Sequence, residues 1–338
     1  MPGLLLDTLR GSRGSRTPVW LMRQAGRYLS EYRELRSAKG GFLELVHDSE
    51  AAAEVTLQPI RRFGFDGAIL FSDILVVPHA LGQDLAFLAG EGPRLSPALV
   101  DASLESLTAA PERLDPVYRT VRLVRERLGP ETTLLGFAGS PWTVATYMIA
   151  GEGSREQKAA RLMAYRDPEG LEAVIEAIIG VTVDYLDRQV EAGAEAVQLF
   201  DSWAGSLAPR EFERWVIGPN ARIVAAFKAR HPEVPVIGFP KGAGGKLAAY
   251  ADETRVDAIA IDETVDPVWA NAVLPAGMPV QGNLDPLLLL SGGQDLAGST
   301  RAILEAFADR PHVFNLGHGI DKDTPIAHVE ELLTIVRG

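Results

Sequence analysis

The sequence predicts one (β/α)8 barrel, and three observations lead to this prediction. Short apolar runs rich in β-branched residues alternate with longer helical patterns along the chain. Most of these runs are apolar throughout, which is typical of parallel strands buried on both faces. No linker rich in Pro, Gly or Ser divides the 338 residues, a length that α/β barrels reach as one domain. A doubly wound sheet is the alternative, because it also alternates strand with helix.

The expected elements follow from this alternation. Residues 1–17 contain the segment RGSRGSRT and predict a flexible lead-in, whereas residues 18–338 predict a single barrel domain. We expect eight strands, at Val19–Met22, Ala68–Phe71, Thr133–Phe137, Ala196–Phe200, Val234–Gly238, Ala258–Ile261, Pro279–Gln281 and Val313–Leu316. We expect helices at Glu50–Phe63, Pro116–Leu128, Pro168–Ala192, Arg210–Arg230, Gly298–Ala308 and Pro325–Val336. Functional groups of such a barrel lie just after the strands, at their carboxyl ends.

Composition limits the classes of function. The formal net charge of −12 argues against nonspecific nucleic-acid binding and against attachment to anionic membranes. An anionic ligand would therefore need a local basic pocket. The chain has no cysteine, which excludes disulfides, thiolate metal sites and cysteine nucleophiles, and no His/Asp/Glu cluster has metal-ligand spacing. Without a signal-peptide core or a run of about 20 apolar residues, we expect a soluble, cytoplasmic protein.

The first expected strand leads directly into two arginines that lie four residues apart. If the chain turns helically there, Arg23 and Arg27 share a face and repel each other, and a bound anion would remove the repulsion. The planar guanidinium fork grips a carboxylate or a phosphate through two hydrogen bonds. The alternative is that each arginine pairs with a nearby carboxylate, since Glu31 lies four residues after Arg27.

A lone carboxylate follows the second expected strand. Asp73 lies among apolar residues in the segment FSDIL, where a buried carboxylate must find partners or become protonated. Asp73 could accept N–H groups of a ligand or oppose the charge of a cationic intermediate. It could also only cap a helix.

Four more candidates lie near other strand ends. Tyr147, on a helix that begins after Ser140, could bind or transfer a proton, or could belong to the core. Ser202 lacks the surroundings of a hydrolase nucleophile, which favours binding by its hydroxyl over nucleophilic attack. His318 lies between two glycines that allow a ligand to approach closely. Lys241 could form a Schiff base or pair with a carboxylate.

Six segments, spread in order over the chain after residue 17, together resemble uroporphyrinogen decarboxylases. They are PVWLMRQAGRY, FSDIL, GFAGSPWTVATYMI, FDSWAG, GNLDP and FNLGHGI. The resemblance implies a single-domain barrel that works as a homodimer without a metal or an organic cofactor. It also implies removal of the four acetate carboxyl groups of uroporphyrinogen III as CO2, which gives coproporphyrinogen III on the route to haem.

The resemblance assigns roles residue by residue. The segment from Arg23 to Arg27 matches the substrate-binding segment, with both arginines on substrate carboxylates and with Gln24, Ala25 and Gly26 between them. Asp73 matches the carboxylate that sits among the pyrrole N–H groups. Tyr147, Ser202 and His318 match further substrate-binding positions. The residues implied in catalysis are Asp73, Arg23, Arg27 and Tyr147.

The chemistry of the residues agrees with this assignment. Arginines would attract a substrate with eight carboxylates to a protein of net charge −12. Direct loss of CO2 from an acetate arm would leave an unstabilised carbanion, whereas a protonated pyrrole is a cationic electron sink that replaces a cofactor. An ionised Asp73 would stabilise that cation. The proton donor is Arg23, a bound water or another group.

Two other classes of function are compatible with parts of the sequence. Related barrels transfer methyl groups with zinc held partly by cysteine, and the absence of cysteine disfavours that class. A non-catalytic tetrapyrrole binder would use the same binding residues. Turnover of the porphyrinogen distinguishes such a binder from the enzyme.

Overall fold

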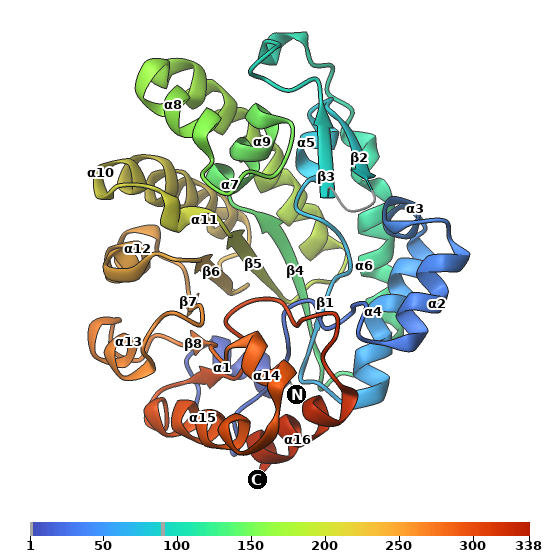
Figure 1. The fold of residues 1–338 in the computed structure, drawn as a ribbon, viewed down its shortest axis with the longest axis vertical. Coiled ribbons are helices and arrows are strands. Elements are labelled where there is room, and N and C mark those ends of the chain that lie inside the picture. The colour runs from blue at the N-terminus through green and yellow to red at the C-terminus, as the bar shows by residue number, and fades with distance from the viewer. Residues whose placement is uncertain (1–2, 89–91) are drawn as a thin grey trace.

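A curled parallel sheet forms the centre of the computed structural model, which describes residues 3–88 and 92–338 (Figure 1). Its seven strands lie in the order β1-β4-β5-β6-β7-β8-β9, and every neighbouring pair is parallel. Their bounds are β1 Gly67–Ile69, β4 Thr133–Gly139, β5 Ala196–Asp201, β6 Val236–Pro240, β7 Ala258–Ala260, β8 Val280–Gln281 and β9 His312–Val313. The predicted α/β barrel class is confirmed.

Helices surround the curled sheet (Figure 1). They are α1 Leu4–Leu9, α2 Ser30–Ala38, α3 Phe42–His47, α4 Ser49–Phe63, α5 Val76–Ala80, α6 Asp115–Arg127, α7 Pro141–Ala150, α8 Lys158–Arg166, α9 Pro168–Glu191, α10 Pro209–Phe212, α11 Gly218–Arg230, α12 Leu247–Thr254, α13 Pro267–Val273, α14 Pro286–Ser291, α15 Gly293–Ala306 and α16 Ile326–Arg337. An antiparallel hairpin that the sequence analysis did not predict, β2 Asp84–Leu88 with β3 Gly92–Ser96, follows α5. In the described part of the chain, no helix is long and apolar enough to cross a membrane.

The N-terminal segment closes the barrel between its last and first strands. The N–H of Phe314 donates to the carbonyl of Pro18, and the N–H of Trp20 donates to the carbonyl of Phe314. On the other side, the N–H of Asp66 donates to the carbonyl of Val19. The eighth predicted position is therefore occupied between β9 and β1.

This eighth position is not the strand that we predicted at Val19–Met22, because only Val19 forms a bridge. The N–H groups of the next two residues donate to side-chain amides and not to a neighbouring strand. The N–H of Leu21 donates to Gln24 Oε1 at 3.1 Å, and the N–H of Met22 donates to Asn315 Oδ1 at 2.9 Å. Strand pairing thus ends just where the arginine segment begins.

The barrel interior below the site contains a chain of buried polar side chains. The indole of Trp20 donates to Gln281 Oε1 at 3.0 Å, and the amide of Gln281 donates to Gln198 Oε1 at 3.0 Å. All three side chains are fully buried. Gly67 makes room for the indole, since a Cβ there would lie 3.2 Å from Trp20 Cγ and 2.9 Å from Leu5 Cδ1.

The predicted flexible lead-in contains a packed helix. The leucines Leu5, Leu6 and Leu9 of α1 are buried, and α1 contacts β4 and β9. Arg16 forms a two-pronged salt bridge with Asp66, with contacts of 2.9 and 2.5 Å. The sequence analysis overlooked the apolar spacing of these leucines beside the RGSRGSRT segment, so the prediction is wrong for α1.

A second difference concerns the helix predicted at Arg210–Arg230. The structure divides it into α10, a π-helical turn at Glu213–Ile217, and α11. Pro219 has no N–H for the regular helical bond, and the widened turn accommodates this gap. The other predicted strands agree with the structure within two residues at each end, except Val313–Leu316, where β9 ends at Val313.

Candidate active site

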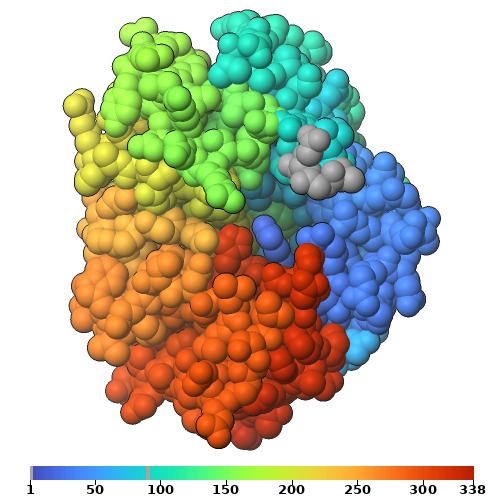
Figure 2. Space-filling model, in the orientation of Figure 1, coloured from blue at the N-terminus to red at the C-terminus, as the bar shows by residue number. Residues whose placement is uncertain are grey.

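Most of the predicted site residues lie in loops at the carboxyl ends of the strands, whereas Tyr147 lies on α7. Figure 2 shows a hollow on the face seen in Figure 1, with part of the blue N-terminal segment inside it. The loops after α7, β5, β6 and β7 also enclose a pocket of about 270 Å3. It is lined by Arg155, Gln157, Ser202, Trp203, Gly205, Ser206, Lys241, Gly242, Asp262 and Thr264.

The backbone around Arg23 is unusual. Arg23 has a φ of +61°, in the left-handed region that residues other than glycine rarely adopt. The N–H of Ile320 donates to the carbonyl of Met22, which joins this turn to the last site loop. The stem of Arg23 crosses Gly319 so closely that a Cβ there would lie 2.3 Å from Arg23 Cδ. Gly319 is therefore needed for the position of the Arg23 side chain.

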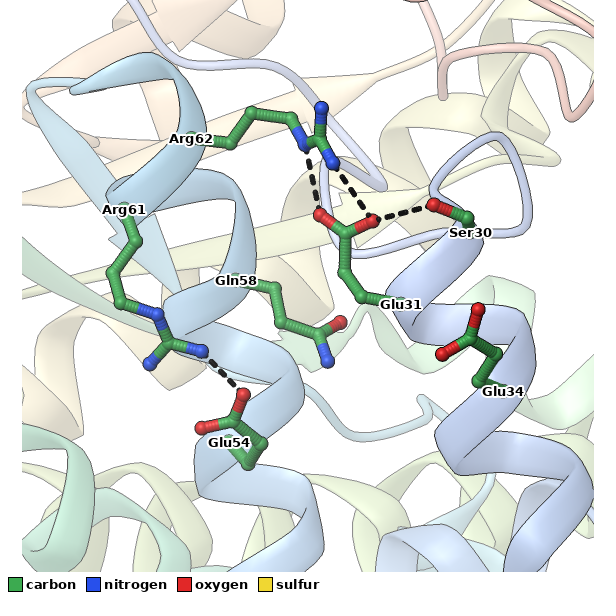
Figure 3. A pocket seen from close by; sticks show the side chains of 7 residues that line it. All are labelled: Ser30, Glu31, Glu34, Glu54, Gln58, Arg61 and Arg62. Carbon is green, nitrogen blue, oxygen red and sulfur yellow. Dashed lines mark hydrogen bonds and ion pairs between the residues drawn. The ribbon is translucent and has the colours of Figure 1, made fainter.

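The structure distinguishes the two explanations for the arginine pair. Glu31, the expected partner of Arg27, instead accepts two hydrogen bonds from Arg62 of α4, at 2.8 and 3.1 Å (Figure 3). Within residues 3–88 and 92–338, neither Arg23 nor Arg27 has a carboxylate partner, and both are exposed. Two uncompensated guanidinium groups in a protein of net charge −12 are suited to binding an anion.

The structure shows how Gln24, a predicted contact residue, is held in this segment. Gln24 is fully buried, with its side chain bonded to the N–H of Leu21 and to the carbonyl of Gly67. Its own N–H donates to Leu21, and its carbonyl accepts the hydroxyl of Tyr28. These bonds hold the turn that carries Arg23 and Arg27, and contact of Gln24 with a ligand stays a prediction. Ala25 and Gly26 are partly exposed.

Asp73 follows β1 and is partly exposed. Its Oδ1 accepts the N–H of Leu75 at 2.8 Å, which is an Asx turn. Asp73 is not the N-cap of α5, because Leu75 occupies that position. Burial raises the pKa of Asp73 to about 6, although the bond from Leu75 and the charge of Arg23 oppose the shift.

His318 presents a fixed hydrogen-bond donor. The N–H of Gly319 donates to His318 Nδ1 at 2.6 Å, so Nδ1 is the acceptor and Nε2 carries the proton. Burial lowers the pKa of His318 to about 3, and the charges of Arg23 and Lys241 add to the effect while Asp262 opposes it. His318 is therefore neutral near pH 7 and can donate from Nε2.

Tyr147 and Ser202 bring hydroxyl groups to the same region. Burial raises the pKa of Tyr147, and the nearby charge of Asp73 adds to the rise, while the Trp203 indole and Arg23 oppose it. Tyr147 therefore keeps its proton near neutral pH and lies close to both charged site residues. Ser202 is partly exposed and lines the pocket beside Lys241.

A row of aromatic rings crosses the barrel beneath these polar groups. Phe137 and Phe200 are 5.6 Å apart, Phe200 and Phe239 are 5.9 Å apart, and Phe239 lies 6.4 Å from the ring of His318. Successive rings meet edge to face. The combination of an apolar floor with a basic entrance suits a large ring that carries carboxylates.

The comparisons with known proteins agree over the whole chain. The family model described as "Uroporphyrinogen decarboxylase (URO-D)" matches residues 3–338. The chain belongs to the uroporphyrinogen decarboxylase family. A relative from Erythrobacter litoralis, named uroporphyrinogen decarboxylase, is 73% identical over 100% of this chain and 99% of its own length. A relative of the same name from Paracoccus denitrificans is 52% identical over 99% of this chain and 98% of its own length.

Solved structures support the fold of the family. A methyltransferase from Methanosarcina mazei superposes with a TM-score of 0.82 at 19% identity, covering 98% of this chain and 96% of its own. A putative vitamin-B12-independent methionine synthase from Listeria monocytogenes has a TM-score of 0.57 at 14% identity, covering 95% and 94% of the two chains. At these identities the likeness concerns the fold alone.

Sequence reasoning assigned no role to several residues around the candidate site. The phenylalanine row was not predicted, although Phe200 ends one predicted strand, Phe239 directly follows the next, and the two residues pair in register. Asp262 holds two loops, since its Oδ2 accepts the N–H of Gly242 at 2.7 Å and its Oδ1 accepts the N–H of Thr264 at 3.0 Å. Lys241 lies 3.5 Å from Glu263, which fits the predicted carboxylate pairing.

Among the residues that the structure describes, no group of three or more His, Cys, Asp or Glu could hold a metal ion.

Proposed function

We propose that this protein is a uroporphyrinogen decarboxylase that converts uroporphyrinogen III to coproporphyrinogen III by removing four acetate carboxyl groups. The observation that carries the proposal is the pair Arg23 and Arg27, which lack carboxylate partners among the described residues, together with Asp73, whose carboxyl senses the charge of Arg23. Family membership supplies the identity of the substrate. Arg23 and Arg27 bind substrate carboxylates, and the phenylalanine row supports the tetrapyrrole ring.

Each decarboxylation begins with protonation of the pyrrole ring that bears the acetate arm. The bond between the acetate methylene and its carboxylate then breaks, CO2 leaves, and the electron pair neutralises the ring cation. A proton added to the exocyclic methylene carbon, with loss of the ring proton, leaves a methyl group. One proton is consumed for each CO2 released, and the substrate itself serves as the electron sink.

The side chains differ in charge and in whether they donate or accept hydrogen bonds, and their roles follow from these differences. Ionised Asp73 accepts pyrrole N–H groups and stabilises the ring cation. Neutral His318 donates from Nε2, and the hydroxyls of Tyr147 and Ser202 donate to substrate oxygens. Arg23 and a bound water are the alternatives for the proton donor.

The deciding experiment is an anaerobic assay with the reduced porphyrinogen, with products separated by carboxyl count. We expect stepwise loss from eight carboxyl groups to four, at an undiminished rate after dialysis against a strong chelator. Binding without turnover would identify a non-catalytic tetrapyrrole binder and contradict the proposal. Activity that disappears on dialysis and returns with added metal would contradict the mechanism.

We also propose that the enzyme is a cytoplasmic homodimer, as the resemblance implies. The exposed apolar side chains of Val268, Trp269 and Leu287 are candidates for coverage by a second copy. Sedimentation at micromolar concentration should give twice the mass of the chain, and a monomer mass would contradict the dimer. Cell fractionation tests the location.

A further inference from the structure

The turn that carries Ser202 is attached to α7 by a buried carboxyl. Asp201, the last residue of β5, is fully buried and immediately precedes Ser202. Its Oδ1 accepts the hydroxyl of Thr143, in the first turn of α7, at 2.5 Å. This contact joins the carboxyl end of a barrel strand to the helix that carries Tyr147.

The same threonine also holds the next peptide group. Thr143 Oγ1 accepts the N–H of Trp203 at 3.1 Å. The carbonyl of Trp203 accepts the indole N–H of Trp142 at 3.2 Å and the hydroxyl of Ser206 at 2.8 Å. Both polar groups of residue 203 are therefore bonded, and two of the three side chains that bind them come from α7.

We propose that Thr143 and Asp201 form a positioning pair that holds the Ser202–Trp203 turn against α7 and so fixes the direction in which Ser202 faces the substrate. The inference rests on the proposed function, because it assigns Ser202 to a tetrapyrrole carboxyl group. Neither Thr143 nor Asp201 reaches the cleft, since both are fully buried.

The direction of the hydrogen bonds explains why both members are needed. A threonine hydroxyl has one proton and two lone pairs. Donation of the proton to Asp201 turns a lone pair toward the N–H of Trp203, so Asp201 fixes the rotation of the hydroxyl. Tyr147 lies one helical turn after Thr143 on α7. The pair thus links the elements that carry two substrate-binding hydroxyls, whose spacing must be maintained for productive binding.

The test compares three substitutions on α7 in the decarboxylase assay. Thr143→Val keeps the shape but removes the hydroxyl, and we expect KM to rise about fivefold to tenfold with kcat within about twofold. Thr143→Ser keeps the hydroxyl and should restore KM. Thr146→Val is the matched control, because the buried Thr146 hydroxyl bonds only within α7, to the carbonyl of Thr143 at 2.7 Å. Its KM should equal that of the wild type.

A double-mutant cycle with Ser202→Ala separates positioning from general destabilisation. If Thr143 acts through Ser202, Thr143→Val should change KM by less than about twofold in the Ser202→Ala background. An equal effect in both backgrounds, or a lower melting temperature with unchanged KM, would overturn the inference. If Thr143→Val does not fold, the same double-mutant cycle is measured with Thr143→Ala. An inactive wild-type enzyme would instead contradict the proposed function.

Discussion

Two pairs of arginines, Arg23 with Arg27 and Arg61 with Arg62, differ in whether carboxylates neutralise them. In the outer groove between α2 and α4, Arg62 is bonded to Glu31 and Arg61 to Glu54 (Figure 3). In the cleft, Arg23 and Arg27 have no carboxylate partner among the described residues. The outer groove encloses about 460 Å3, against about 270 Å3 for the pocket beside Ser202. Uncompensated charge, rather than cavity size, therefore distinguishes the functional region.

Carboxyl groups differ between the two regions in the same way. Burial alone would raise the pKa of Glu31, but the bonds from Arg62, from its own backbone and from Ser30 together lower it. For Asp73, burial prevails and the pKa rises to about 6. The arginines of the outer groove are neutralised by Glu31 and Glu54, whereas the arginines of the cleft have no carboxylate partner among the described residues.

The largest effect is expected at Asp73. Asp73→Asn keeps the shape and the turn to Leu75 but removes the charge, so turnover should fall by about 10²–10³-fold because the ring cation loses its counter-charge. Asp73→Glu keeps the charge and should retain more activity. Turnover and melting temperature of both variants are the measurements. If Asp73 only forms the turn, Asp73→Asn should leave turnover and melting temperature nearly unchanged, because Asn forms this turn equally well.

The arginines come next. Arg27→Ala removes a charge-assisted contact of about 1.5–3 kcal/mol, so KM should rise by roughly 10- to 100-fold. Arg23→Ala should also lower kcat if Arg23 delivers the proton. Arg61→Ala, in the outer groove, is the control, and its KM should be unchanged because an exposed pair contributes only about 0–1 kcal/mol to folding. Equal KM values in all three variants would make the cleft arginines structural.

The sequence could predict these candidates but not their partners. The barrel and its strand ends follow from apolar runs, so Arg23, Asp73 and His318 lie in the segments after the expected strands, as predicted. Whether Glu31 neutralises Arg27 depends on Arg62, which is 31 residues from Glu31 and reaches it only once α2 packs beside α4. The burial of Gln24 depends in the same way on Gly67. Local spacing contains no information about such contacts.

Acid should inactivate the enzyme through Asp73. Its carboxyl must be ionised, so kcat/KM should fall about tenfold per pH unit below about 6. The effect on folding has the opposite sign. A native pKa above the unfolded value of about 3.9 means that the native state binds more protons between about pH 4 and 6, and stability falls as pH rises through that window. Asp73→Asn should lose the acid limb of the activity profile and should show a smaller pH dependence of melting temperature, which pH profiles of both quantities would check. Part of the stability change should remain, because burial also raises the pKa of Asp201, to about 7.

The smallest expected effect is a change in KM caused by a substitution in the outer groove. Arg62→Ala breaks the bonds to Glu31 and releases a carboxylate four residues after Arg27. If Arg62 keeps Glu31 away from the cleft, the free carboxylate should compete weakly with substrate for Arg27. An exposed pair at this spacing is worth about 0.2–0.5 kcal/mol, which corresponds to at most about a twofold rise in KM.

The double variant Arg62→Ala with Glu31→Gln decides the cause of that rise. The glutamine side chain that replaces Glu31 carries no charge to compete for Arg27, so the wild-type KM should return although the outer groove has lost its ion pair. A rise that persists in the double variant would mean that Arg62 supports the cleft by packing α2 against α4. An unchanged KM in Arg62→Ala would show that Glu31 cannot reach Arg27. In that case the cleft arginines would stay free without help from the outer groove.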